Sequence, residues 1–186
     1  GTERGTITRT SGWAIGLNAT NNIWSNAATW FNQQANKTII VVTRKTSYAG
    51  NCCAFSIGTN AAAGTCNIYT HDTTGTLVYV NGSTRHSPGG SIPPANSNEA
   101  IICWRQTATN NNVLNINNAT NPANVTDATL ANSLTGWAIG CWHANGSALT
   151  PSQGFSGDVK AVLVYNRALT DAEAQDVYAY YHVPKT

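Results

Sequence analysis

Short apolar runs separated by turn-forming residues recur along almost the entire chain. Most of them are rich in β-branched and aromatic residues and are shorter than eight residues, which is typical of β-strands. The segments between them, such as "HSPGGSIPPANSN" and "TATNNN", have the composition of loops. A succession of short strands without intervening helices predicts an antiparallel sandwich. The expected strands are Trp13–Leu17, Thr38–Arg44, Cys53–Ile57, Asn67–Thr70, Thr76–Val80, Ala100–Gln106, Val113–Asn117, Trp137–His143 and Val159–Tyr165.

One segment near the C-terminus departs from this pattern and predicts a helix over about residues 171–182. Thr170 and Glu173 have the spacing of a capping box at the helix start, and Pro184 stands where the helix should end. Apolar residues follow at helical spacing and define one face of the helix. Because such a face must be buried, we expect the helix to pack on the sandwich, with its tyrosines serving as packing residues. The face consists of Ala174, Val177, Tyr178 and Tyr181, with Leu169 packing on Ala174 ahead of the first turn.

The pentapeptide GWAIG occurs twice, at Gly12–Gly16 and at Gly136–Gly140. The residues that follow the two copies share little, so a duplicated domain is not indicated. In a strand, Trp and Ile at alternate positions point to one face, while the other face carries only the small residues Ala and Gly. We therefore interpret the copies as two strands with the same packing, within a single domain that spans residues 1–186.

The chain has few charges: 10% of its residues are charged and its net charge is +2. The ten basic residues are scattered, which argues against a nucleic-acid partner. No apolar run in the sequence approaches the roughly 20 residues of a membrane span, so membrane insertion is not expected. A surface made polar by hydroxyl and amide groups suits an extracellular all-β protein.

The five cysteines favour disulfides over a metal site. They and the four histidines lack the spacing of zinc ligands, so no metal site is predicted. Disulfides agree with an oxidising compartment and therefore with an extracellular or secreted protein. We expect one bridge between Cys103 and Cys141, because each lies in an apolar strand, and another from Cys66 to Cys52 or Cys53 across a hairpin. The connectivity is not determined by the sequence, and the fifth cysteine is left as a free or intermolecular thiol.

Six N-x-[ST] sequons point to the same compartment. In a chain so rich in Asn and Thr some sequons arise by chance, and unused sequons are the alternative. Two of them contain Asn-Gly after an expected strand, which indicates a turn. We predict N-glycosylation at several of the sites if the source is eukaryotic. The acceptors are Asn18, Asn36, Asn81, Asn118, Asn124 and Asn145.

The stretch "GFSGDVKAVLVYNRALTDAEAQDVYAYY" (Gly154–Tyr181) resembles the closing strand and helix of laminin-G-like, concanavalin A-like domains. The shared pattern is an aromatic residue, Gly, an acid and an apolar strand, followed by Y-N-R-A-L and a helix that starts at Ser or Thr. Upstream, "TIIVVTR" and "GWAIG" resemble further strands of the same family. The resemblance implies an all-β fold, a two-sheet antiparallel jelly-roll sandwich of the concanavalin A-like type with one C-terminal helix.

Because this fold also hosts glucanases, catalysis has to be tested against the acidic residues. Retaining glycosidases need two carboxylates about 5 Å apart, which laminarinase-type members place on one strand as E-x-D-x-x-E. The glutamates Glu3, Glu99 and Glu173 form no such pair, and no expected strand carries two acids at the required spacing. We therefore predict that the chain is not an enzyme and needs no cofactor. A calcium ion at Asp72 in "HDTTG" is a weak alternative to a turn held by that side chain.

Exposed aromatic residues are the remaining means of binding a sugar. If Cys103 and Cys141 point into the sandwich, alternation along each strand directs Trp104 and Trp142 outward. Two outward Trp side chains would form a glycan platform or a protein contact. The alternative is that a loop, the C-terminal helix or the protein's own glycan covers them.

These observations favour a non-catalytic, N-glycosylated extracellular module that acts as an adhesive or structural subunit of a surface, fibre or virion assembly. Its partners would be neighbouring copies of itself or a surface glycan. The N-terminal segment "GTERGTITRTS" alternates like a strand that can complete a neighbour's sheet edge. A carbohydrate-binding, lectin-like module is the main alternative. A glycoside hydrolase of this fold is disfavoured by the distribution of acids.

Overall fold

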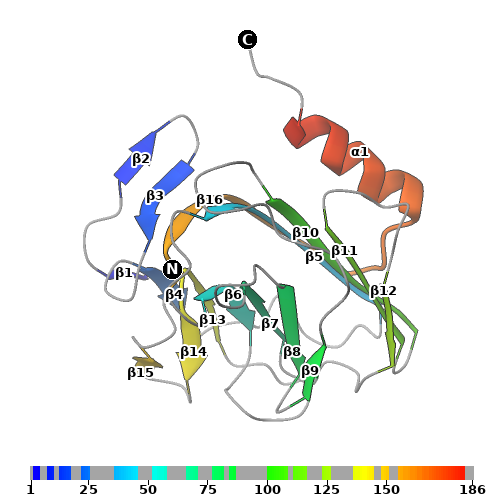
Figure 1. The fold of residues 1–186 in the computed structure, drawn as a ribbon, viewed down its shortest axis with the longest axis horizontal. Coiled ribbons are helices and arrows are strands. Elements are labelled where there is room, and N and C mark those ends of the chain that lie inside the picture. The colour runs from blue at the N-terminus through cyan, green and yellow to red at the C-terminus, as the bar shows by residue number, and fades with distance from the viewer. Residues whose placement is uncertain are drawn as a thin grey trace.

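The structure of the chain is a computed structural model, and antiparallel strands dominate its described part (Figure 1). The residues that it describes are 2–4, 8–10, 13–17, 22–25, 36–45, 52–57, 66–70, 77–81, 84–86, 100–108, 111–116, 123–126, 136–144, 148–150 and 155–182. Within these ranges the strands form two large sheets and a short hairpin, and one helix follows the last strand.

The first large sheet is named here the helix-covered sheet. Its strands are β2 (Thr8–Thr10), β3 (Trp13–Leu17), β5 (Lys37–Lys45), β10 (Ala100–Ala108), β11 (Asn111–Ile116), β12 (Ala123–Thr126) and β16 (Gly157–Tyr165). They lie in the order β12-β11-β10-β5-β16-β3-β2, and every pairing is antiparallel. The long central strand β5 pairs with β10 on one side and β16 on the other, so residues far apart in sequence become neighbours.

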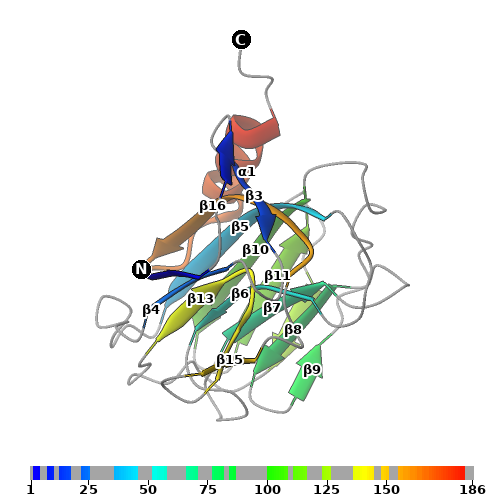
Figure 2. The same cartoon turned by 90° about the vertical axis from the view of Figure 1, so that its left-hand side faces the viewer.

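The second large sheet is named here the facing sheet. Its strands are β1 (Thr2–Arg4), β4 (Asn22–Ser25), β6 (Cys52–Ile57), β7 (Cys66–Thr70), β8 (Leu77–Asn81), β9 (Thr84–His86) and β13 (Trp137–Ile139). They lie in the order β1-β4-β13-β6-β7-β8-β9. A hairpin of β14 (Trp142–Ala144) and β15 (Ala148–Thr150) continues from β13. The two large sheets stack face to face (Figure 2).

The helix α1 (Asp171–His182) lies on the outer side of the helix-covered sheet, away from the facing sheet (Figures 1 and 2). Its start is the predicted capping box. The backbone N–H of Glu173 donates to Thr170 Oγ1 over 3.2 Å, and the N–H of Thr170 donates to Glu173 Oε2 over 2.8 Å. These two bonds satisfy amide groups that the first turn leaves without helical partners. The helix is too short and too polar to span a bilayer.

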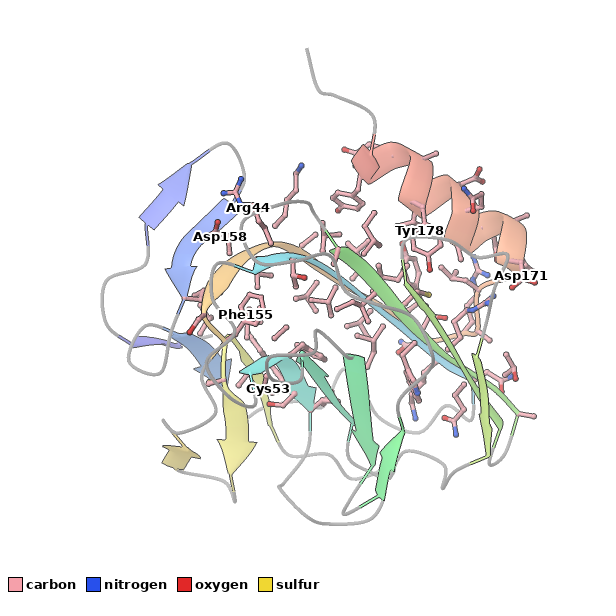
Figure 3. All side chains as sticks on the ribbon, in the orientation of Figure 1. Arg44, Cys53, Phe155, Asp158, Asp171 and Tyr178 are labelled. Carbon is pink, nitrogen blue, oxygen red and sulfur yellow. The ribbon has the colours of Figure 1, made fainter. Side chains whose placement is uncertain are left out.

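Strands β5 and β10 carry unbroken apolar runs because both faces of the helix-covered sheet are buried. Alternate residues of each strand therefore belong to two separate cores, one on either face of the sheet. The inter-sheet core includes Ile39, Val41, Ile102, Trp104 and Phe155. The helix core includes Ile40, Val42, Ile101, Cys103, Leu169, Ala174 and Tyr178. Figure 3 shows Phe155 in the space between the sheets and Tyr178 on α1, above the opposite face.

The structure confirms the predicted all-β class, the antiparallel sandwich and the C-terminal helix with its buried face. The two GWAIG copies fall in different sheets, as β3 and β13. The expected strand Trp137–His143 is divided into β13 and β14, because Gly140 interrupts it with a φ of +81°. A Cβ at Gly140 would also lie 3.2 Å from the Leu17 side chain, so the chain turns there at a residue without one.

The predicted disulfide between Cys103 and Cys141 is wrong. Cys103 belongs to the helix core, whereas Cys141 packs with Ala138 on the facing sheet. The helix-covered sheet therefore separates the two sulfur atoms, and both residues are buried thiols. The prediction failed because it placed every apolar strand face in one shared core.

The predicted bridge from Cys66 to Cys52 or Cys53 is also wrong, although the two strands do form the expected hairpin pair. Cys66 pairs with Ile57, while Cys52 and Cys53 pair with Thr70 and Tyr69 at the other end of the ladder. From Ile57 back to Cys53 is about 13 Å of strand. A disulfide requires Cα atoms within about 7 Å of each other, so the register excludes either bridge.

Candidate functional site

Trp104 does not form part of a surface platform. Its side chain is fully buried in the inter-sheet core, so the prediction of an outward Trp104 is wrong. The alternation itself was correct, since Cys103 and Trp104 point to opposite faces. The error lay in taking the Cys103 face for the sandwich interior, when α1 covers that face instead. Trp142 lies in β14 opposite Thr150, and its side chain is outside the described part of the structure.

The described residues instead form a hollow between β16 and α1, named here the aromatic hollow. It has a volume of about 310 Å³ and opens to solvent. Its walls come from both elements because odd-numbered residues of β16 face the helix, while the C-terminal half of α1 turns its edge toward the strand. The lining residues are Leu163, Tyr165, Asp176, Val177, Tyr180 and Tyr181.

Two adjacent tyrosines form the aromatic wall of the hollow. The ring centroids of Tyr180 and Tyr181 are 5.0 Å apart, with an interplanar angle of 85°, which is the edge-to-face arrangement that aromatic pairs prefer. Tyr181 is half-buried, whereas the Tyr180 side chain is 61% exposed. Tyr180 is the one exposed large hydrophobic residue among the described side chains. The structure thus presents a ring that is held in orientation yet accessible to a ligand.

Neighbouring polar groups set the electrostatics of this wall. The Nζ atom of Lys160 lies 6.0 Å from the centroid of the Tyr181 ring, at the range of a cation–π contact. Burial raises the pKa of Tyr181, and the adjacent Tyr180 and Tyr165 side chains raise it further. The Tyr181 hydroxyl therefore stays protonated at neutral pH and remains able to donate a hydrogen bond.

Asp176 is the carboxylate of the hollow, and it differs from the other acids of α1. Asp171 pairs with the buried guanidinium of Arg105 over 2.6 Å, and Glu173 pairs with Arg167 over 2.7 Å. In the described part of the chain, Asp176 makes no ion pair. It is exposed and lines the hollow, so its two oxygens are available as acceptors.

The start of α1 is tied firmly to the helix-covered sheet, which fixes one wall of the hollow relative to the other. Thr38 Oγ1 donates to the carbonyl oxygen of Arg167 and accepts from the N–H of Leu169, both over 2.9 Å. Arg105 Nη1 donates to the carbonyl oxygen of Leu169, also over 2.9 Å. Tyr178 packs into the helix core about two turns after the helix start, with 1% of its surface exposed.

The remaining predicted site residues are only partly described. Asn36 is exposed directly before β5. Asn81 ends β8 and pairs with Thr84 of the antiparallel strand β9, and Asn124 lies in β12 opposite Val113. The predictions at Asn18, Asn118, Asn145 and Asp72 lie outside the described residues. Within the described ranges, no three His, Cys, Asp or Glu side chains gather as metal ligands do.

Sequence reasoning missed the aromatic hollow. It expected the helix tyrosines to serve in packing, which is true of Tyr178 but not of Tyr180. A signal was present, since Tyr180 falls outside the apolar stripe and is a large aromatic residue at an exposed helix position. The contribution of β16 depends on the tertiary packing of the helix against that strand, which no local pattern reveals.

Solved structures with this architecture include three of diverse origin. The heptameric SAP-like pentraxin from Limulus polyphemus matches with a TM-score of 0.65 and 16% identity, over 88% of this chain and 80% of the pentraxin chain. The Ruminococcus gnavus IT-sialidase CBM40, bound to α2,3-sialyllactose, matches with a TM-score of 0.63 and 16% identity, over 81% and 86%. A botulinum neurotoxin type C structure matches with a TM-score of 0.71 and 8% identity, over 98% of this chain and 46% of the toxin chain.

No protein-family model matches the sequence, and no curated protein is similar to it. At identities of 16% or less, the structural matches establish the fold alone. The matched sandwiches share the two stacked antiparallel sheets described above. This chain therefore has the fold of a concanavalin A-like sandwich, with a C-terminal helix on its helix-covered sheet.

Proposed function

We propose that the chain is a non-catalytic, carbohydrate-binding module that holds a glycan in the aromatic hollow. The observation that carries this proposal is the composition of the hollow: an exposed, oriented tyrosine ring beside a carboxylate without a cationic partner in the described residues. A volume of about 310 Å³ lies at the lower end of the range for ligand pockets. Apolar walls with a few convergent polar groups are the usual design of such sites.

The structural neighbours support a glycan in preference to another ligand. The CBM40 structures contain sialyllactose in its α2,3 and α2,6 forms. Cell entry of the botulinum neurotoxin depends on two ganglioside molecules, which are glycolipids. Sugar ligands are therefore named for two proteins that contain this fold and share only 8–16% of their sequence with this chain.

The state of the described carboxylates supports binding without cleavage. Hydrolysis of a glycosidic bond requires two carboxyl groups on either side of it. Asp158 is buried and accepts two hydrogen bonds from Arg44 through one oxygen (Figure 3). Asp171 and Glu173 are engaged by arginines, and among the described acids Asp176 alone lines the hollow. A single carboxylate suits recognition, not hydrolysis.

A glycan array followed by isothermal titration calorimetry tests the proposal. We expect the wild-type chain to bind at least one oligosaccharide, and Tyr180→Ala to weaken that binding about tenfold, because an aromatic contact contributes about 0.5–1.5 kcal/mol beyond its area. Gln175→Ala is the matched control, an exposed helix residue that does not line the hollow. The proposal fails if no glycan binds, if Tyr180→Ala binds like the wild type, or if the bound oligosaccharide is hydrolysed.

A second candidate function is an adhesive or structural subunit that assembles with copies of itself at a surface, fibre or virion. It is supported by the heptameric state of the pentraxin neighbour and by the end strands β2, β12, β1 and β9, where the two sheets offer edges for strand addition. Native mass spectrometry at increasing protein concentration separates the two functions. A defined oligomer supports assembly, and a monomer at all concentrations contradicts it.

The extracellular, N-glycosylated location is part of the same proposal. It is supported by Asn36, an exposed sequon acceptor directly before β5. Secretion from eukaryotic cells, followed by enzymatic deglycosylation, should lower the mass of the wild-type chain, and Asn36→Gln should reduce that loss by one glycan. An unchanged mass in both chains would contradict glycosylation at Asn36.

A further inference from the structure

We propose that the aromatic hollow selects an uncharged sugar residue that directs two neighbouring hydroxyl groups at Asp176, without a bound metal ion. This inference rests on the proposed function and specifies its ligand. It is carried by the placement of Asp176 among the hollow's tyrosines and by the pairing of the other helix acids.

The carboxylate of Asp176 can accept hydrogen bonds from a ligand in the hollow. An ionised carboxylate accepts hydrogen bonds at two oxygens and donates none. Asp171 and Glu173 receive guanidinium groups, whereas the part of the chain that the structure describes gives Asp176 no cation. Two adjacent sugar hydroxyls supply two parallel donors to such a carboxylate. Hydrogen bonds to an ionised acceptor are stronger than neutral ones, so this pair would orient the sugar ring.

The exposed Tyr180 ring offers a surface on which a sugar can stack. Tyr181 contacts Tyr180 edge to face, and the Tyr180 side chain is 61% exposed. The apolar C–H face of a pyranose can stack on that ring while its hydroxyls reach Asp176, one helical turn earlier. Leu163 and Val177 add apolar surface to the lining of the hollow. Both halves of an amphipathic sugar residue thus meet a matching surface.

The negative charge of Asp176 favours a neutral sugar over a carboxylated one. A carboxylated sugar in the hollow would bring a second negative charge against Asp176, and like charges in contact are repulsive. The Nζ atom of Lys160 lies 6.0 Å from the centroid of the Tyr181 ring, and Lys160 is not part of the hollow's lining. Arg167, at the start of the helix, is paired with Glu173. The hollow therefore disfavours acidic sugars.

Matched glycan pairs test this inference. The chain is titrated by calorimetry with neutral oligosaccharides from the array and with their carboxylated counterparts, lactose and 3′-sialyllactose being one such pair. We expect the neutral member to bind at least tenfold more tightly, and the affinity to be unchanged by EDTA. Asp176→Asn should weaken the binding of the neutral sugar severalfold and reduce the difference in affinity between the two members of the pair to less than threefold.

The outcomes separate this inference from the function on which it rests. Equal or tighter binding of the carboxylated member, loss of binding in EDTA, or an Asp176→Asn variant with an unchanged ratio would overturn the inference and leave glycan binding intact. Failure of every glycan to bind would overturn both. Binding of tetramethylammonium ion in the hollow, weakened by Tyr180→Ala in the absence of any sugar binding, would identify an aromatic cage for a cation and also overturn both.

Discussion

The packing of α1 on the sandwich can be tested at Tyr178, whose side chain is 1% exposed in the helix core. Burying an aromatic side chain removes about 150–250 Å² from water, which corresponds to about 4–6 kcal/mol at 25 cal/mol per Å². Measured substitutions of buried aromatic residues by alanine cost about 3–5 kcal/mol. We therefore expect Tyr178→Ala to lower the free energy of unfolding by about 3–5 kcal/mol and the Tm by about 6–20 °C.

Two matched variants isolate the reason for that loss. The Tyr178 hydroxyl is buried without an oxygen or nitrogen partner among the described residues, and the Cys103 thiol beside it is a weak hydrogen-bonding group. Tyr178→Phe should therefore stay within about 1 kcal/mol of the wild type. Tyr180→Ala, which removes an exposed ring from the same helix, should change stability by less than about 0.5 kcal/mol. Urea denaturation followed by far-UV circular dichroism gives all three values, and a Tyr178→Ala loss below about 1 kcal/mol would refute the packing argument.

Three further predictions concern the same face of the molecule. Arg105→Met should lower the free energy of unfolding, measured by urea denaturation, by about 1–3 kcal/mol, because the Leu169 carbonyl loses a buried donor. Asp171→Asn should lower it by less than about 1 kcal/mol, because Asp171 is 71% exposed. Equal losses in the two variants would contradict the role given to Arg105. The hydrogen bonds from Arg167 and Thr170 lower the pKa of Glu173 from 4.5 to about 2, so its stabilising effect is present above pH 4.5 and is lost as the pH falls toward 2. Glu173→Gln should therefore reduce the change of the urea midpoint with pH over that interval. A pH profile like that of the wild type would contradict the capping box. Burial raises the pKa of the Cys103 thiol to about 11. Iodoacetamide at pH 8 should therefore label Cys103 in urea but not in the native chain, as measured by peptide mass spectrometry. Labelling of the native chain would place the thiol at the surface and contradict this account.

Much of the fold could be predicted because local chemistry and tertiary structure agree along most of the chain. The helix begins where predicted because Thr170 and Glu173 bond to each other's backbone amides. Alternation along β10 correctly sends Cys103 and Trp104 to opposite faces. These features depend on interactions between residues close in sequence, which a pattern records directly.

The errors arose where the answer depended on which surfaces meet. An unbroken apolar strand does not say which face lies between the sheets, and the helix added a second core that reversed the assignment of Trp104. The pairing of Cys103 with Cys141 failed for the same reason, because the two residues belong to different layers. The aromatic hollow exists because Tyr165 on β16 and Tyr180 on α1 line the same space, an arrangement set by the docking of the helix.

The most direct measurement of the central claim is two-dimensional NMR of the chain with ring-labelled tyrosines during titration with the tightest-binding neutral oligosaccharide. If the glycan occupies the aromatic hollow, the ring signals of Tyr180 and Tyr181 should shift in proportion to saturation, while those of the buried Tyr178 remain in place. Saturable binding that leaves the Tyr180 and Tyr181 signals unmoved would place the sugar elsewhere on the sandwich and contradict the account.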